Sequence, residues 1–156
     1  MRLDRTWIER NIPHHGRMCL LEEVVEWDAH RICCRSGTHR AADHPLRSQG
    51  RLGIASGIEY AAQAMAVHGA LTGPDTAAGD PRPARPEAGF LAGLRNVRLH
   101  VLRLDDIESD LICVAELLAG DQGSALYEFA VTSAALPLLS GRATVVFDAD
   151  GRLQQP

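Results

Sequence analysis

One segment constrains the fold more than any other, and it spans residues 53–72 (GIASGIEYAAQAMAVHGALT). Its polar positions are few: Ser56, Glu59, Tyr60, Gln63, His68 and Thr72. Helix-tolerant residues fill the rest, so we predict a helix over 53–72. Apolar residues occur all round rather than in one stripe, so the helix should be enclosed on most sides. Its small residues, with Glu59 and Gln63 near the middle, favour a buried core helix over a membrane span.

Strand patterns occupy both sides of this helix. Before it, they cover 17–27 and 30–38, with a tight turn at 28–29 that predicts antiparallel neighbours. After it, alternating or continuous apolar runs cover 97–102, 111–118, 127–132 and 143–147, with turns at 105–106, 120–123 and 137–141. The pattern predicts an α+β protein with five or six strands. One long helix between the second and third strands packs most economically inside a curled antiparallel sheet.

The remaining segments predict a single domain over 1–156. A chain of 156 residues, 46% hydrophobic and 23% charged, is typical of one soluble core. Residues 4–11 carry a short helical pattern that Pro13 ends. Residues 73–86 (GPDTAAGDPRPARP) hold four prolines and no apolar residue larger than alanine, so we expect an exposed, mobile connection.

Charge and cysteine content exclude several function classes. The net charge of −4 lacks the concentrated basic field of nucleic-acid binding proteins. Every basic residue is arginine, so no lysine can form a Schiff base. The cysteines at 19, 33, 34 and 113 form no C-x-x-C pair, and we interpret them as buried thiols. Because the first 13 residues do not resemble a signal peptide, we expect a cytoplasmic protein.

Glu59 is the first candidate for chemistry. Burial disfavours an ionised carboxylate and would raise its pKa towards the range of a general acid. Gln63 lies one turn further on and could orient the Glu59 carboxyl group. The alternative is that Glu59 lies at an edge of the helix, solvated or paired with an arginine, with Gln63 in the same small exposed window.

The seven histidines show no metal-ligand spacing, so we expect no metal site. His44 precedes the helix in a polar stretch, and a loop could bring its ring to Glu59; otherwise it is a surface histidine. We interpret His14 as part of a turn and His68 as a polar contact of the helix. Gly53 and Gly57 at the helix start leave backbone N–H groups accessible to negative charge, or else allow close packing on a strand.

The order of these features resembles the hot-dog-fold 3-hydroxyacyl-ACP dehydratases of the FabA/FabZ kind. Residues 12–27 (IPHHGRMCLLEEVVEW) resemble their opening, where a proline–histidine turn leads into the first strand. Residues 44–63 (HPLRSQGRLGIASGIEYAAQ) resemble their catalytic stretch, although HPLRSQGRLG replaces the usual H-F-P-G loop and M-P-G helix start. Residues 90–105 are similar to their next strand. The resemblance covers about 12–147 and is closest to dehydratases of fatty-acid-like and aryl-polyene pathways.

This resemblance implies a reaction and a set of roles. The fold would be a hot-dog, and the reaction would convert 3-hydroxyacyl-ACP into trans-2-enoyl-ACP. His44 would remove the α-proton and Glu59 would protonate the departing hydroxyl. The N–H groups near Gly53 and Ile54 would hold the thioester carbonyl, with Gln63 orienting Glu59. No cofactor is implied, because the phosphopantetheine of an acyl carrier protein carries the substrate.

The resemblance also implies partners. Family members are dimers in which one chain supplies the histidine and the other the carboxylate, so we expect a homodimer or higher homo-oligomer, or a heterodimer with a related dehydratase. A sheet that covers one side of a helix leaves an open edge that pairing would close. An acidic carrier protein could meet several arginines, although scattered surface arginines are the alternative. They are Arg40, Arg47, Arg51, Arg82 and Arg85.

Two further readings keep the fold and change the function. In the first, a carboxylate on the same helix activates water, and the protein is an acyl thioester hydrolase. In the second, the chain is a non-catalytic partner subunit that completes or stabilises an active dehydratase.

Overall fold

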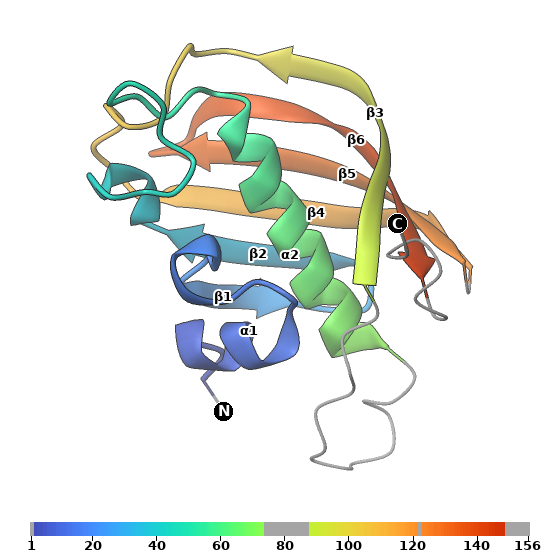
Figure 1. The fold of residues 1–156 in the computed structure, drawn as a ribbon. Coiled ribbons are helices and arrows are strands. Elements are labelled where there is room, and N and C mark those ends of the chain that lie inside the picture. Colours follow the sequence, from blue (N-terminus) through green and yellow to red (C-terminus); the bar gives the residue numbers. More distant parts are fainter. Residues whose placement is uncertain (1, 74–87, 122, 149–156) are drawn as a thin grey trace, which may run out of the picture.

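A six-stranded antiparallel sheet curls around one long helix in the computed structural model, which describes residues 2–73, 88–121 and 123–148 (Figure 1). The elements are α1 (Arg5–Asn11), η1 (Gly16–Met18), β1 (Glu23–Trp27), β2 (Arg31–Ser36), η2 (Thr38–Arg40), α2 (Ser56–Thr72), β3 (Ala88–Leu99), β4 (Leu111–Gly120), β5 (Ser124–Ser133) and β6 (Leu136–Asp148). The strand order is β1-β2-β4-β5-β6-β3. This arrangement confirms the predicted fold.

Helix α2 is enclosed as its apolar composition predicts. Residues 56–71 are all buried or half-buried, and the helix packs on β2, β4 and β5. It begins at Ser56, three residues later than predicted, because residues 52–54 are hydrogen-bonded to the chain at 102–104. Gly57 lies against β6, where a Cβ atom would overlap the Leu139 side chain. The structure therefore confirms the close-packing interpretation for Gly57.

The first strand is shorter than predicted, whereas the hairpin after it is as expected. Residues 16–18 form a 3₁₀ turn, residues 19–21 are fully buried, and β1 begins only at Glu23. In the turn, Asp28 Oδ1 accepts hydrogen bonds from the N–H groups of His30 and Arg31, at 2.7 and 2.9 Å. Strands β1 and β2 are antiparallel neighbours, as the short connection predicts.

The later strands are longer than their apolar patterns suggest. Strand β3 begins at Ala88 and not near Val97, and β6 begins at Leu136. The predicted turn at 137–141 is therefore wrong, because these residues lie inside β6. The turn is Ala134–Ala135, whose φ angles of 48° and 65° both lie in the left-handed region. Tight antiparallel hairpins use this geometry because its twist matches that of the strands.

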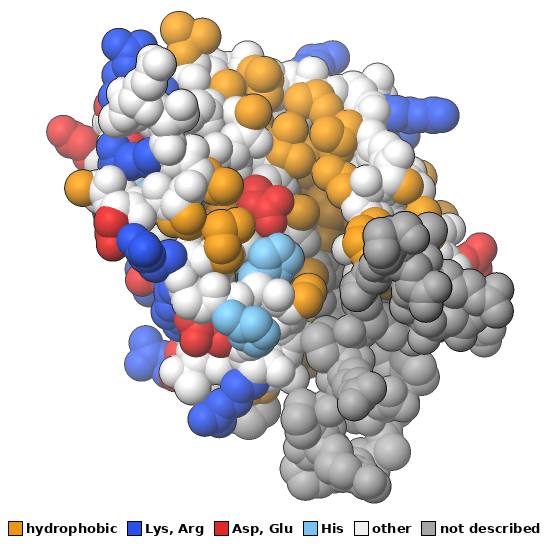
Figure 2. Space-filling view, viewed as in Figure 1, with side chains coloured by type: hydrophobic (Ala, Val, Ile, Leu, Met, Phe, Trp, Pro, Cys, Tyr) orange, Lys and Arg blue, Asp and Glu red, His pale blue; other side chains and the backbone are white. Residues whose placement is uncertain are grey.

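Among the described residues, strand β3 is an open edge of the sheet, and the sequence predicts that one edge is open. Its neighbour in this chain is β6, and bulges interrupt the pairing at 91–93 and 95–98. The other edge differs, because residues near the start of the chain bond to β1, with the Val24 N–H donating to the Leu3 carbonyl. Figure 2 shows hydrophobic side chains gathered over β3 and the flank of α2 beside it.

Three further expectations concern the cysteines, the proline-rich connection and the membrane. All four cysteines are free and buried, as predicted, and burial raises the pKa of each thiol. Residues 74–86 of the predicted mobile connection lie outside the described residues. None of the helices in the described part of the chain has the length and hydropathy of a membrane span.

Candidate functional site

The first polar cluster on α2 pairs Glu59 with His14. Glu59 lies in the first turns of α2, and His14 follows Pro13 in the segment between α1 and η1. His14 Nε2 lies 3.1 Å from Glu59 Oε1, and the two side chains are 30% and 35% exposed. Figure 2 shows histidine and acidic side chains together at the surface of this face. His14, which the sequence predicts only as part of a turn, is therefore the partner of Glu59.

The hydrogen bond from His14 lowers the pKa of the Glu59 carboxyl group. Burial acts in the opposite direction, and Gln63 makes a smaller lowering contribution. The predicted upward shift is therefore wrong, because a hydrogen bond to the charged form outweighs desolvation. Glu59 is ionised at neutral pH. Beside it, His14 Nδ1 is buried without a hydrogen-bond partner, as is His39 Nδ1 elsewhere, which is uncommon for a buried polar atom.

Gln63 fastens the segment that carries His14 to α2. Its side chain is fully buried. Gln63 Oε1 accepts from the Leu20 N–H at 2.8 Å, and Gln63 Nε2 donates to the Met18 carbonyl at 2.7 Å. We expected Gln63 to orient Glu59 directly. Both of its amide atoms are instead bonded to residues 18–20, so Gln63 acts mainly by fixing the chain just after His14.

The second polar cluster on α2 holds His44 beside Tyr60. His44 is only 5% exposed. Its Nδ1 accepts from the Leu46 N–H at 3.1 Å, so its Nε2 carries the proton and donates to the Tyr60 hydroxyl at 3.0 Å. The Tyr60 hydroxyl donates in turn to Thr38 Oγ1 at 2.7 Å, because the Thr38 hydroxyl itself donates to the Leu20 carbonyl. We call His44, Tyr60 and Thr38 the buried network.

This geometry does not favour His44 as the base. A base needs a free lone pair, and both ring nitrogens of His44 are engaged within the chain. Burial also lowers the pKa of His44, with a further contribution from Arg47, and raises the pKa of Tyr60. His44 therefore contacts Tyr60, the residue next to Glu59, whereas His14 is the histidine that contacts the Glu59 carboxylate.

The helix start does not offer all the N–H groups that the sequence suggested. The Ile54 N–H donates to the Leu102 carbonyl at 3.1 Å, and Gly53 forms a bridge with Arg103. The first N–H groups of α2, from Ser56 and Gly57, donate to Gly53 and Ile54 at 3.0 and 2.9 Å. The Ile54 N–H is therefore engaged within the chain, because residues 53–54 run extended beside 102–104.

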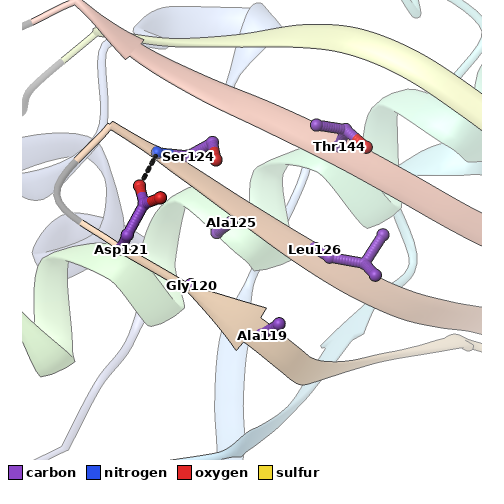
Figure 3. A pocket seen from close by; sticks show the side chains of 7 residues that line it. All are labelled: Ala119, Gly120, Asp121, Ser124, Ala125, Leu126 and Thr144. Atoms are coloured by element: carbon purple, nitrogen blue, oxygen red, sulfur yellow. Dashed lines mark hydrogen bonds between the residues drawn. The ribbon is translucent and has the colours of Figure 1, made fainter.

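Other features lie apart from these clusters. His68 is buried, accepting from the Tyr127 hydroxyl at 2.8 Å and donating to the Asp28 carbonyl at 2.9 Å, which fits its predicted role as a polar contact. A hollow at the β4–β5 hairpin is lined by none of the candidate residues (Figure 3). Within the described residues, no three His, Cys, Asp or Glu side chains gather closely enough to hold a metal ion.

Comparison with known proteins adds a family to this geometry. The family model of the ApeP-like proteins, described as ApeP dehydratase, matches residues 6–155. The chain belongs to this dehydratase family. It is also similar to a chain of the dehydratase heterocomplex ApeI:P from Xenorhabdus doucetiae, with 26% identity, coverage of 95% of both chains and a TM-score of 0.77. The ApeP-like family assignment confirms the resemblance to hot-dog dehydratases.

More distant structures share the fold alone. A thioesterase from Pseudomonas aeruginosa is 10% identical over 80% of this chain and 79% of its own, with a TM-score of 0.55. A hypothetical thioesterase from Streptococcus pneumoniae, solved with coenzyme A, is 9% identical over 81% and 84%, with a TM-score of 0.56. A comparison with curated proteins gives no significant match. The hot-dog fold is therefore common to both enzyme classes, and the ApeP-like family assignment points to dehydration.

Proposed function

We propose that this chain is a subunit of a dehydratase that converts 3-hydroxyacyl-ACP into trans-2-enoyl-ACP and water, in a fatty-acid-like or aryl-polyene pathway of the cytoplasm. The observation that carries this proposal is the half-exposed Glu59, ionised and held by His14 on the central helix. The ApeP-like family assignment supports dehydration, and the sequence resemblance supports an acyl group on a carrier protein.

The chemistry fits a carboxylate of this kind. Dehydration breaks the C–H bond at the α-carbon, and its electron pair forms the double bond as the β-hydroxyl leaves. One proton is removed and one is added, so no electron acceptor or cofactor is needed. The ionised Glu59 takes the α-proton and, once protonated, delivers a proton to the departing hydroxyl. His14 stabilises the ionised carboxylate before the first step and holds the Glu59 side chain in place.

A partner subunit completes the proposed enzyme. The open edge at β3 supports pairing with a second hot-dog subunit, and the similarity to a dehydratase heterocomplex supports a related dehydratase in that position. Because His44 is engaged in the buried network, we assign any second catalytic histidine to the partner. The alternative of a homodimer or larger homo-oligomer is tested below.

The carrier protein would approach through exposed arginines. Two of the arginines expected to meet it are already engaged, since Arg40 pairs with Asp110 at 2.6 Å and Arg47 donates to the Ala41 and Gly50 carbonyls. Arg51 is exposed at the loop before α2. Arg82 and Arg85 lie outside the described residues. Arg51 is therefore the described arginine that we assign to an acidic carrier surface.

A non-catalytic partner role is the second candidate. It is favoured by the engagement of both His44 nitrogens and by the altered sequence HPLRSQGRLG before the helix. In this role the chain would stabilise a related dehydratase, and its Glu59 would transfer no proton.

The test is enoyl formation from a 3-hydroxyacyl-ACP by the chain alone and by its complex with a co-expressed related dehydratase. Glu59→Gln in this chain should lower the rate about 100-fold or more, because it removes the proton-transfer group. Glu128→Gln is the matched control, since its exposed carboxylate pairs with Arg142 at 3.7 Å on the outer face of the sheet.

The outcomes separate the candidate functions. An unchanged rate in the Glu59→Gln complex would assign the chain to the non-catalytic role. Release of free thiol from the substrate with no enoyl product would identify a thioesterase instead.

A further inference from the structure

The inner face of β3 carries an apolar strip that lies partly exposed among the described residues. The register places Leu94 opposite Ala143 and Leu99 opposite Leu139, and both of these β6 residues are buried against the core. Helix α2 packs mainly on β2, β4 and β5. Four apolar side chains of β3 are consequently 36–51% exposed: Leu91, Leu94, Val97 and Leu99. Figure 2 shows this hydrophobic band beside α2.

The outer face of the same strand ends a row of charges that crosses the sheet. The residues of the row are neighbours in register from β2 to β3: Arg31, Glu116, Glu128, Arg142 and Arg95. A guanidinium nitrogen of Arg142 lies 3.7 Å from Glu128 Oε2, so Arg142 is paired with a carboxylate of β5. Arg95 stands at the open edge opposite another arginine. Arg98, further along, stands opposite Ser140.

We call these six β3 residues the β3 seam, with its four apolar side chains on the inner face and Arg95 and Arg98 on the outer face. Between residues 88 and 99 the strand carries no acidic residue. A second copy of this chain pairing through β3 would bring the same two arginines and no carboxylate from this stretch. Like charges across neighbouring strands destabilise pairing, whereas opposite charges stabilise it. The seam is therefore poorly complementary to itself.

We propose that the β3 seam selects its partner by charge. Its occupant is the edge strand of a different subunit, which covers the apolar strip and places carboxylates opposite Arg95 and Arg98. This inference rests on the proposed function insofar as the enzyme needs a partner subunit. It adds which two residues discriminate against a second copy, and which charges the partner strand must carry.

The test uses a charge-reversed copy of this chain as a surrogate partner. Wild type and an R95E/R98E variant are mixed in equal amounts, and native mass spectrometry separates the two like dimers from the mixed dimer. Random pairing gives half of all dimers as mixed. We expect the mixed dimer to be about tenfold tighter than the wild-type dimer at low salt, so that it dominates. The excess should shrink at high salt, which screens exposed charges.

A matched control separates charge at the seam from net charge. The R10E/R51E variant has the same charge change at exposed positions outside β3. It should mix randomly with wild type. An R95Q/R98Q variant, which removes repulsion without adding attraction, should give a wild-type-like circular dichroism spectrum and an intermediate dimer affinity.

Several results would overturn the inference. They are random mixing of wild type with R95E/R98E, no mixed dimer at all, or a wild-type homodimer as tight as the mixed one. The measurement involves no substrate, so loss of the dehydratase assignment would leave its result unchanged. Conversely, a homodimer that forms enoyl product would refute charge selection and retain the proposed reaction.

Discussion

Two neighbouring residues of α2, Glu59 and Tyr60, belong to clusters of opposite character. Glu59 and His14 are half-exposed, and one nitrogen of His14 lacks a partner. The buried network around Tyr60 is closed, because both nitrogens of His44 and the Tyr60 hydroxyl have partners. The start of one helix therefore carries an accessible, ionised carboxylate beside a buried network of neutral groups.

This contrast distinguishes chemistry from scaffolding. A proton-transfer group needs access to substrate and a charge state that changes at low cost. A satisfied buried network resists both, because breaking it leaves desolvated donors and acceptors. We therefore assign proton transfer to Glu59 and its tuning to His14, and we assign His44 and Tyr60 to holding residues 38–46 against the helix.

The largest effect should come from the exposed pair. His14→Asn removes the hydrogen bond that lowers the pKa of Glu59 and holds its carboxylate in place, and we expect enoyl formation by the complex to fall about 100-fold. The free energy of unfolding should change by less than about 1 kcal/mol, because a half-exposed pair adds little stability. His15→Asn, at the adjacent exposed position, is the matched control for rate and urea unfolding. A variant that keeps its rate and loses stability would place His14 in the scaffold.

The buried network should give the reverse pattern. Tyr60→Phe leaves the His44 N–H without an acceptor, so we expect a loss of about 1–3 kcal/mol in urea unfolding. The rate should change by less than about threefold, a margin that we set well below the effect expected for His14. Adding His44→Phe should recover part of the stability, since removing both partners leaves no unsatisfied group. A large loss of rate with unchanged stability would make this network the reactive one.

The two clusters should also respond to different pH ranges. Burial lowers the pKa of His44, and likewise of His39 and His68, so the folded state binds fewer protons than the unfolded chain. Their contribution to the free energy of unfolding is complete above the pKa of histidine in the unfolded chain, about 6.5, and is lost as the pH falls below that value. The free energy of unfolding should fall by no more than about 1.4 kcal/mol per pH unit for each histidine. The pKa of Glu59 is also lowered, so Glu59 has the same proton balance, but its contribution to the free energy of unfolding is lost only below its usual value of 4.5.

Urea unfolding at pH 8, 7, 6 and 5 checks this separation. The double variant of His44 and Tyr60 should flatten the slope between pH 7 and pH 5, and Glu59→Gln should leave it unchanged. An identical slope in the double variant would mean that His44 titrates normally in the folded protein.

Much of the fold could be predicted because its signals are local. The all-round apolar pattern of α2 reports enclosure, and the turn at Asp28 is set by a side chain that bonds to its own neighbours. Strand ends were less predictable, because they depend on residues distant in sequence. Cys19 to Leu21 read as strand from their composition, yet the Leu20 N–H is bonded to Gln63, 43 positions away.

The site was only partly predictable for the same reason. Glu59 stood out because a carboxylate interrupts an enclosed helix. Its partner His14 could not be identified, since 45 positions separate the two residues and no local pattern connects them. The state of His44 depends on which nitrogen accepts the Leu46 N–H, a choice that the folded loop determines.

The most direct measurement is single-turnover enoyl formation by the complex in which this chain alone carries Glu59→Gln. If Glu59 transfers the proton, the rate falls about 100-fold or more. A control complex in which this chain carries Glu128→Gln instead should react at the wild-type rate. A Glu59→Gln complex that forms enoyl-ACP at the wild-type rate would contradict the assignment of proton transfer to this chain.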